Sequence, residues 1–341
     1  MLRRRLPLSA AAVALCVGGA VSVSTHAAPL FTENFDVNNA ANWTVNNNNN
    51  GTNAANFSFN YGSVGIPSAD GPGGTTVGLK LQANISGTGP ASGVLPAISV
   101  SPNGQSFTGD YTVSFKWWHN FLGSTTGGIG NSAGGSGSTQ ISTFGVMTAG
   151  DTANYAGASD SVFFAATGDG ASAQDFRAYS KEQPTGYATG ITGNNAHNVY
   201  AAGSQNSSAA LYQTAFPAGA QAPTAQSNAA ATQTGSTLAG MAGFRWHDVV
   251  IEKAGNLITW KVNGTLFDTV DLTNFTPANL PTGSNILFGM SDTSLGAGTP
   301  ASAFQTYDFT LIDNISVVPE PACLSVLGLA GLAMARRRPT R

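Results

Sequence analysis

The sequence predicts an all-β fold, an antiparallel β-sandwich that carries one long low-complexity insertion. Three observations lead to this fold class. Residues 111–118 alternate apolar and polar side chains, and residues 245–272 contain three short strands joined by tight turns. Further strand-like runs recur between loops rich in Gly, Asn and Ser. About a dozen antiparallel strands are typical of a sandwich or a barrel.

The candidate strands follow one another along most of the chain. Outside the 245–272 unit they span 31–36, 57–61, 77–83, 93–100, 111–118, 141–148, 161–167, 175–180, 285–292 and 305–317. The face of strand 111–118 that we expect to be buried carries Tyr111, Val113, Phe115 and Trp117. The last strand likewise predicts one apolar face, which carries Tyr307, Phe309, Leu311, Ile315 and Val317.

The clearest unit is the stretch from Arg245 to Leu272, which predicts a three-stranded meander. Val249 and Ile251 share a face of its first strand. The second strand ends at Asn263-Gly264, a dipeptide typical of a type I′ hairpin because both residues tolerate positive φ. Consecutive hairpins of this kind pair antiparallel.

Three stretches interrupt the strand pattern. Asn46–Asn50 and Gly123–Ser138 are expected to be loops because of their Asn-rich and Gly/Ser-rich compositions. Residues 185–242 consist mainly of small and polar residues, which predicts a long, partly disordered insertion that buries little; a short helix near 209–214 fits within it. We therefore expect one domain over residues 29–318.

The amino terminus predicts a secretory signal peptide over residues 1–28. Three arginines are followed by an apolar run from Leu6 to Val23 and then by small residues, the order that signal peptidase recognises. Cleavage is expected after Ala27 or Ala28. The alternative is a retained membrane anchor.

The carboxyl terminus, residues 319–341, has a related composition. Pro319, Glu320 and Pro321 precede an apolar run over residues 322–335, which Arg336, Arg337 and Arg338 terminate. Fourteen apolar residues are fewer than the roughly 20 that span a bilayer comfortably. The arginines favour the cytoplasmic side. This order predicts a transient membrane stop that leaves the preceding chain outside.

The Pro-Glu-Pro, the short Leu/Gly/Ala helix and the arginine cluster closely resemble the PEP-CTERM sorting signal of Gram-negative bacteria. The resemblance covers about the last 25 residues. It implies an exosortase-like membrane enzyme as a partner, transient anchoring in the inner membrane, and delivery to the cell surface or extracellular matrix. Whether the helix is retained or removed stays open.

The body resembles concanavalin A-like and laminin G-like jelly rolls. The resemblance is carried by the opening stretch 30–45, by the meander and by the closing stretch 307–317. It implies that the first and last strands pair, and that the sandwich is a jelly roll. Members of this superfamily include glycoside hydrolases, and many hold a calcium ion.

Composition excludes several kinds of chemistry from residues 29–318. Both cysteines, Cys16 and Cys323, lie in the terminal segments, so this region has no disulfide, thiolate nucleophile or thiolate ligand. It has seven Lys and Arg against sixteen Asp and Glu, a formal charge near −9. A nucleic-acid partner is excluded because a phosphate backbone needs clustered positive charge.

Catalytic residues are not predicted. Paired carboxylates on one strand would indicate a glycoside hydrolase, but Glu33, Glu182 and Glu252 have no such partner run. Asp248 and Glu252 share a strand face, which more simply indicates a solvated surface. Three histidines could act as a base for a serine nucleophile, His119, His197 and His247, but an all-β sandwich offers no strand-to-helix turn to present that serine.

Two binding sites are predicted with competing interpretations. Calcium would use oxygen ligands from Asp292, Asp308 and Asp313, together with Asp36 and Asn314; each of these Asp residues could instead cap a turn. A sugar would use Trp118, His119 and Asn120 as an aromatic platform with a nearby amide. The alternative is that this second face packs beneath the insertion or a second sheet.

The sequence thus predicts an exported, noncatalytic surface or matrix protein, processed by signal peptidase and an exosortase-like enzyme and binding a polysaccharide or mediating adhesion. One alternative is a divergent glycan-active hydrolase. The other is a purely structural surface protein.

Overall fold

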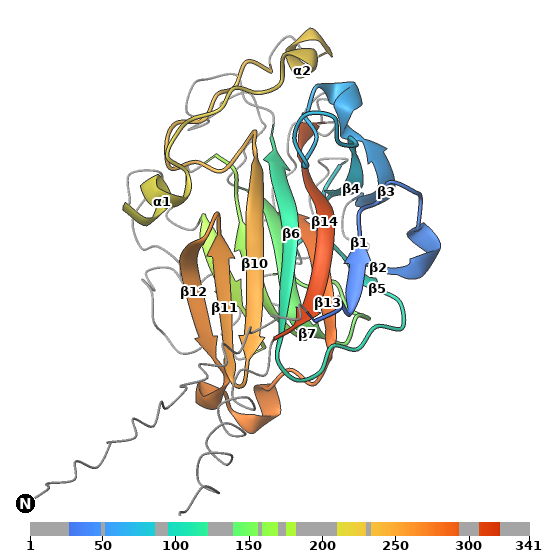
Figure 1. Ribbon diagram of the computed structural model, residues 1–341, viewed down its shortest axis with the longest axis vertical. Coiled ribbons are helices and arrows are strands. Elements are labelled where there is room, and N and C mark those ends of the chain that lie inside the picture. Colours follow the sequence, from blue (N-terminus) through green and yellow to red (C-terminus); the bar gives the residue numbers. More distant parts are fainter. Residues whose placement is uncertain are drawn as a thin grey trace, which may run out of the picture.

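A computed structural model describes residues 27–48, 52–85, 95–121, 139–155, 159–169, 175–181, 210–229, 233–292 and 307–320. These residues form two antiparallel sheets that pack face to face, which confirms the predicted β-sandwich (Figure 1). The predicted terminal helices and the 123–138 loop lie outside them. In the described part, no helix is long and apolar enough to cross a membrane.

The first sheet has the order β12-β11-β10-β6-β14-β4-β3, and β1 pairs with the end of β14. Its strands are β1 (Phe31–Glu33), β3 (Ala54–Asn60), β4 (Val77–Gln82), β6 (Tyr111–Asn120), β10 (Trp246–Ala254), β11 (Leu257–Val262), β12 (Thr265–Asp271) and β14 (Phe309–Pro319). The meander was predicted correctly, and its hairpin residues Asn263 and Gly264 have φ of 50° and 76°. Pairing of the first and last strands is also confirmed.

The second sheet has the order β2-β5-β13-β7-β8-β9. Its strands are β2 (Trp43–Asn47), β5 (Ala97–Pro102), β7 (Gln140–Thr148), β8 (Val162–Ala166), β9 (Phe176–Tyr179) and β13 (Asn285–Asp292). Strand β2 was missed because its polar residues were assigned to the 46–50 loop. Asn46 and Asn47 in fact extend it and pair with Ser99 and Ile98.

Large apolar side chains from both sheets fill the space between them. Trp117 and Trp260 are fully buried there, together with Phe144 and Phe288. Phe115 lies edge-on to Phe288, with ring centroids 4.9 Å apart. The predicted buried face of β6 is thus confirmed, and it supplies much of the apolar area that stabilises the sandwich.

The prediction of a single apolar face for the last strand is wrong. A bulge between Asp313 and Ser316 shifts the register of β14 against β6, with Asn314 at φ of 51°. An extra residue reverses the alternation of side chains. Leu311 therefore lies on the outer side of the first sheet, buried in a second apolar cluster, while Ile315 and Val317 lie in the core between the sheets.

The described part of the insertion buries more than its composition predicted. It contains α1 (Ala210–Ala215), which agrees with the expected short helix, and α2 (Thr224–Ala229). Tyr212 and Phe216 stack around Phe176 of the second sheet. Short 3-10 helices complete the described elements: η1 (Ala40–Asn42), η2 (Tyr61–Val64), η4 (Leu272–Asn274) and η5 (Pro277–Asn279).

Candidate functional site

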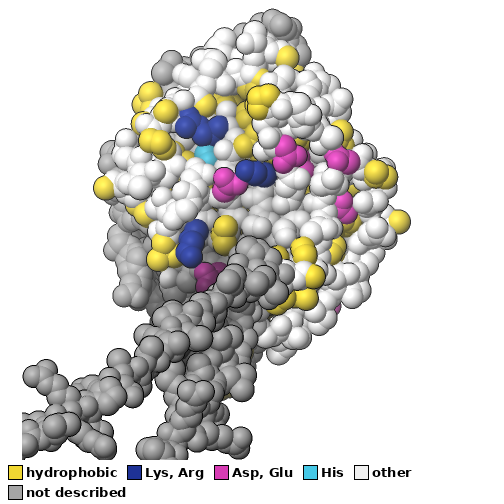
Figure 2. Space-filling view, in the orientation of Figure 1, with side chains coloured by type: hydrophobic (Ala, Val, Ile, Leu, Met, Phe, Trp, Pro, Cys, Tyr) yellow, Lys and Arg dark blue, Asp and Glu magenta, His cyan; other side chains and the backbone are white. Residues whose placement is uncertain are grey.

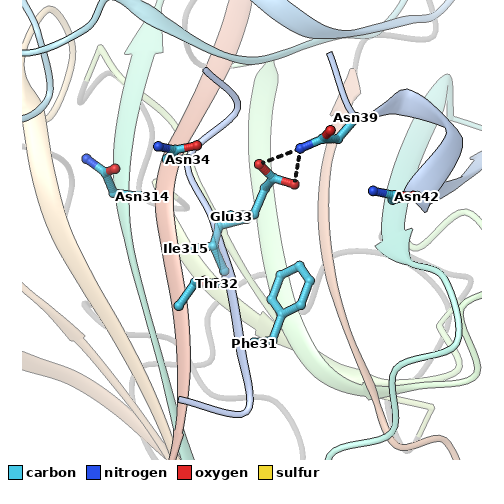
Figure 3. A pocket seen from close by; sticks show the side chains of 8 residues that line it. All are labelled: Phe31, Thr32, Glu33, Asn34, Asn39, Asn42, Asn314 and Ile315. Carbon is cyan, nitrogen blue, oxygen red and sulfur yellow. Dashed lines mark hydrogen bonds between the residues drawn. The ribbon is translucent and has the colours of Figure 1, made fainter. Parts of the chain in front are cut away.

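A cavity of about 660 Å³ lies beside β1, where the first strand, the loop through η1 and the β14 bulge meet (Figure 3). We call it the Glu33 groove. Its lining combines one carboxylate, four amides, one hydroxyl and two apolar side chains, from Phe31, Thr32, Glu33, Asn34, Asn39, Asn42, Asn314 and Ile315. A concave site with a few placed polar groups beside an apolar wall is typical of small-ligand recognition.

Strand pairing and one buried aromatic ring position Glu33. The residue pairs with Ile315 of β14 at the end of β1. Phe35 then turns the chain in a left-handed conformation, with φ of 57°, and buries its ring against Trp43. Its backbone N–H donates to Glu33 Oε1 at 2.9 Å. The carboxylate is therefore held by the turn that follows it.

The lining amides are also fixed by carboxylates. Asn39 Nδ2 donates to both oxygens of Glu33, at 3.2 and 3.1 Å, as Figure 3 shows. Asn34 Nδ2 donates to Asp36 at 2.6 Å, and Asn314 Nδ2 donates to Asp70 at 2.7 Å. Since a carboxylate only accepts, these contacts fix which end of each amide is nitrogen.

Further negative charge lies next to the groove. Asp313, the neighbour of Asn314, is buried and accepts a hydrogen bond from the Tyr61 hydroxyl at 2.9 Å. Burial, with a smaller contribution from the charges of Asp70 and Asp36, raises the pKa of Asp313 to about 7, against the hydrogen bonds from Tyr61 and the Asn314 N–H. Figure 2 shows Asp and Glu side chains on this side of the outer face. No Lys or Arg belongs to the lining.

The predicted sugar platform is wrong, and the alternative of a packed second face is confirmed. Trp118 is only 2% exposed and lies edge-on to Trp246. Its Nε1 donates to Asn120, which in turn donates to the Tyr307 carbonyl at 2.7 Å. The physical reason is that the insertion and the segment before β14 cover this face, with Ala222, Phe244 and Tyr307 in one cluster with Trp118.

His119 is also enclosed. Its Nδ1 lies 2.8 Å from Ser142 Oγ, which donates to Thr310 Oγ1 at 2.7 Å. Burial lowers the pKa of His119 to about 3. The pair of Ser142 and His119 is fully buried, so this polar contact supports packing and offers no exposed nucleophile.

Within the described residues, the expected calcium ligands take part in hydrogen bonds of their own. Asp292 accepts from Asn84 Nδ2 at 2.6 Å, Asp313 accepts from Tyr61, and the Asp308 carbonyl accepts from Gln82. Across the described ranges, no three His, Cys, Asp or Glu side chains gather closely enough to hold a metal ion. The predicted ligands are thus distributed among separate local contacts, and Asp36 and Asn314 join the amide contacts of the groove.

The carboxylates weighed for catalysis form surface ion pairs. Asp248 lies 2.6 Å from Lys116, and Glu252 lies 3.2 Å from Lys261. This arrangement confirms the solvated-face interpretation. His247 is buried beneath them, with Nε2 2.6 Å from the Ala242 carbonyl. Glu182 and His197 lie outside the described residues.

A second pocket of about 420 Å³ lies between the loop after β7 and η5. Its lining includes Asp160 and Lys181 beside Pro277 and Pro281. Asp160 accepts from Thr148 Oγ1 and from the Ala149 N–H, and so closes its own loop. This pocket and the Glu33 groove each have a single carboxylate in their lining.

The predicted processing residues fall at the edges of the described chain. Ala27 and Ala28 are exposed. Pro319 ends β14 opposite Tyr111, and the Glu320 N–H donates to the Asp110 carbonyl at 3.1 Å. Thr112 Oγ1 donates to the Glu320 carboxylate. Pro321 and the three arginines, Arg336, Arg337 and Arg338, lie outside the described residues.

The Glu33 groove was not predicted from the sequence, because it has neither a carboxylate pair on one strand nor an exposed Trp. The available indication was the density of Asn after the first strand, at Asn34, Asn38, Asn39 and Asn42. Asn314 belongs to the same groove but is distant in sequence, and only the fold brings it there.

No protein-family model and no curated protein matches the chain. Solved structures with a similar fold include an endo-1,3-β-glucanase from Streptomyces sioyaensis (13% identity, TM-score 0.41, 86% of this chain and 96% of that one). A protein of unknown function with a galectin-like fold from Bacillus subtilis has 9% identity and TM-score 0.38, with 86% and 97% covered. The carbohydrate-binding module CBM66 from Bacillus subtilis has 9% identity and TM-score 0.32, with 81% and 95% covered.

Proposed function

We propose that this chain is an exported surface or matrix protein that binds a polysaccharide in the Glu33 groove without cleaving it. The observation that carries this proposal is the combination of the Glu33 carboxylate, four Asn amides and the Phe31 ring in one open cavity. Sugar hydroxyls both donate and accept, so carboxylates and amides suit them. The apolar face of a sugar ring packs well against an aromatic side chain.

A noncatalytic role is favoured by how Glu33 is held. Glycoside cleavage uses two carboxyl groups about 5–10 Å apart, one on each side of the bond. The groove lining supplies one. That one accepts hydrogen bonds from Asn39 and from the Phe35 N–H. These donors fix the orientation of the carboxylate, so that it can serve as a binding group.

Export is supported by the termini. The signal-like residues 1–28 and the Pro-Glu-Pro with its apolar run and arginines enclose a body without cysteine. We propose signal peptidase and an exosortase-like membrane enzyme as processing partners, and the cell surface or extracellular matrix of a Gram-negative bacterium as the destination.

Binding is tested by comparing the protein with an Asn39→Ala/Asn42→Ala variant on a panel of bacterial polysaccharides. Asn42 is exposed and Asn39 is half-buried, so the fold should survive the change. We expect at least one polysaccharide to bind, and the variant to bind it about tenfold more weakly, which corresponds to about 1.4 kcal/mol.

The matched control is Asn274→Ala, a change of an exposed Asn in η4, outside the groove lining. It should leave both the affinity and the melting temperature unchanged. Absence of binding to every polysaccharide, or equal binding by the double variant, would contradict the proposed function.

A further inference from the structure

Several donors of the Glu33 groove are used inside the protein. Three of the four lining amides direct an N–H to a carboxylate, as Asn39 does to Glu33, Asn34 to Asp36 and Asn314 to Asp70. These contacts leave the amide oxygens of Asn39 and Asn314 available to a ligand. Within the described residues, no hydrogen bond is donated to Asn39 Oδ1 or Asn314 Oδ1.

The Glu33 carboxylate adds acceptor capacity. An ionised carboxylate has about four lone-pair positions. Within the described residues, Glu33 accepts from one backbone N–H and one amide. The remaining lone pairs, together with the free amide oxygens, give the lining many acceptors, several of them close to the carboxylate. A ligand that supplies hydrogen-bond donors can therefore use them.

Charge favours the same kind of ligand. The lining has a carboxylate and no cation. Asp36 and Asp70 each accept a hydrogen bond from a lining amide, so their charges also lie close to the groove. Like charges placed together repel, so an anionic polysaccharide such as a polyuronate is disfavoured. A positively charged donor is favoured both by hydrogen bonding to the acceptors of the lining and by attraction to the carboxylates.

We propose that the groove selects polysaccharides that carry free, protonated amino groups, as a deacetylated hexosamine polymer does. An ammonium group is a compact cation with three donors and no acceptor, which complements this lining. The sugar ring would pack against Phe31 and Ile315, and its hydroxyls would reach Thr32 and Asn42. This inference rests on the proposed function and names the class of its ligand.

The test is calorimetric titration of the purified protein at mildly acidic pH, where the sugar amine is protonated. Three ligands of equal length are compared: a glucosamine oligomer, its fully N-acetylated counterpart and an oligouronate. We expect the glucosamine oligomer to bind at least tenfold more tightly than the N-acetylated one, and the oligouronate to bind least. The Glu33→Gln variant should lose most of the difference between the first two.

Glu252→Gln is the matched control, because it removes one negative charge from β10 outside the groove lining. It should keep the preference for the amine. Equal affinity for the glucosamine and N-acetylated oligomers would overturn the amine selection and leave polysaccharide binding intact. Absence of binding to all three and to the wider polysaccharide panel would remove the proposed function itself. Equal binding of a Lys-rich peptide would also overturn the inference, since recognition would then be of any polycation.

Discussion

Asp268 is a buried carboxyl group whose ionised form is disfavoured by burial. Its side chain lies in β12 and is 6% exposed; Oδ1 accepts from the Thr269 N–H at 2.5 Å, and Oδ2 has no hydrogen-bond partner among the described residues. Burial raises the pKa of Asp268 from 3.8 to about 7, against the bond from Thr269. The folded state thus binds a proton more tightly than the unfolded state does. The contribution of Asp268 to stability therefore falls as pH rises from about 4 to about 7.

We expect Asp268→Asn to stabilise the protein at pH 8 and to have little effect at pH 4. Asn keeps the acceptor for Thr269 and removes the buried charge. The gain is at most a few kcal/mol, since each pKa unit corresponds to about 1.4 kcal/mol. Urea denaturation of both proteins at the two pH values measures it. The variant is compared with the wild type at each pH, because the wild-type stability also depends on other groups. Burial lowers the pKa values of His119 and His247, and these two residues change the stability with pH in the opposite direction.

Asp271→Asn is the control for this prediction. Asp271 is partly exposed, and hydrogen bonds from the Thr273 hydroxyl and backbone lower its pKa. Its favourable contribution is present at neutral pH and is lost in acid, so the effect of its substitution has the opposite sign. If Asp268→Asn were less stable than the wild type at pH 8, the ionised Asp268 side chain would be stabilising the fold, contrary to the prediction.

Two adjacent tryptophans show what the sequence could and could not predict for single residues. Alternation in β6 placed Trp117 correctly in the core between the sheets. The same pattern placed Trp118 on the opposite face, which is also correct, but gave no information on what covers it. That cover comes from Ala222 and Phe244, which are about a hundred residues further along the chain.

At the level of elements, local turns were predicted and long-range irregularities were not. The β10–β12 meander followed from its own residues, because Asn263-Gly264 specifies the hairpin. The bulge in β14 depends on how this strand pairs with β6, which periodicity cannot report. The bulge matters for the candidate site, because it places Asn314 and Ile315 in the lining of the Glu33 groove.

The end of β14 joins the folded body to the proposed sorting signal. Pro319 pairs with Tyr111, and Glu320 is bonded to Asp110 and Thr112. We expect the exported wild-type protein to lack its terminal arginines, and deletion of Pro319–Pro321 to leave them in place and hold the protein in the membrane fraction. Intact-mass measurement of the protein from both fractions tests this.

Thr112→Ala is the control for processing, because it removes the contact to Glu320 and leaves the motif unchanged. Its C-terminal mass should match that of the wild type. An exported wild-type protein that still ends at Arg341 would refute the sorting proposal without affecting polysaccharide binding.

On the scale of the whole molecule, the sandwich has a second apolar layer outside its core. Trp118, Phe121 and Phe309 of the first sheet lie under the insertion. Buried amides attach that cover: Gln226 exchanges hydrogen bonds with Asn120 at 2.9 and 3.2 Å. Gln233 donates to Gln226 and to the Phe121 carbonyl. A buried amide that loses its partner costs about 1–3 kcal/mol.

We therefore expect Gln226→Ala to lower the free energy of unfolding by about 1–3 kcal/mol, since Asn120 and Gln233 would lose their shared partner. The cover should loosen, so tryptophan emission should shift to the red as Trp118 becomes hydrated, and proteolysis within 216–240 should accelerate. Polysaccharide binding should persist because no residue of the insertion lines the Glu33 groove. Gln213→Ala removes an exposed contact from α1 to the Ala239 carbonyl and leaves the buried amides in place, so it should not change the emission maximum. An unchanged emission maximum and cleavage rate in Gln226→Ala would mean that apolar packing around Ala222 and Phe244 holds the cover without the amides.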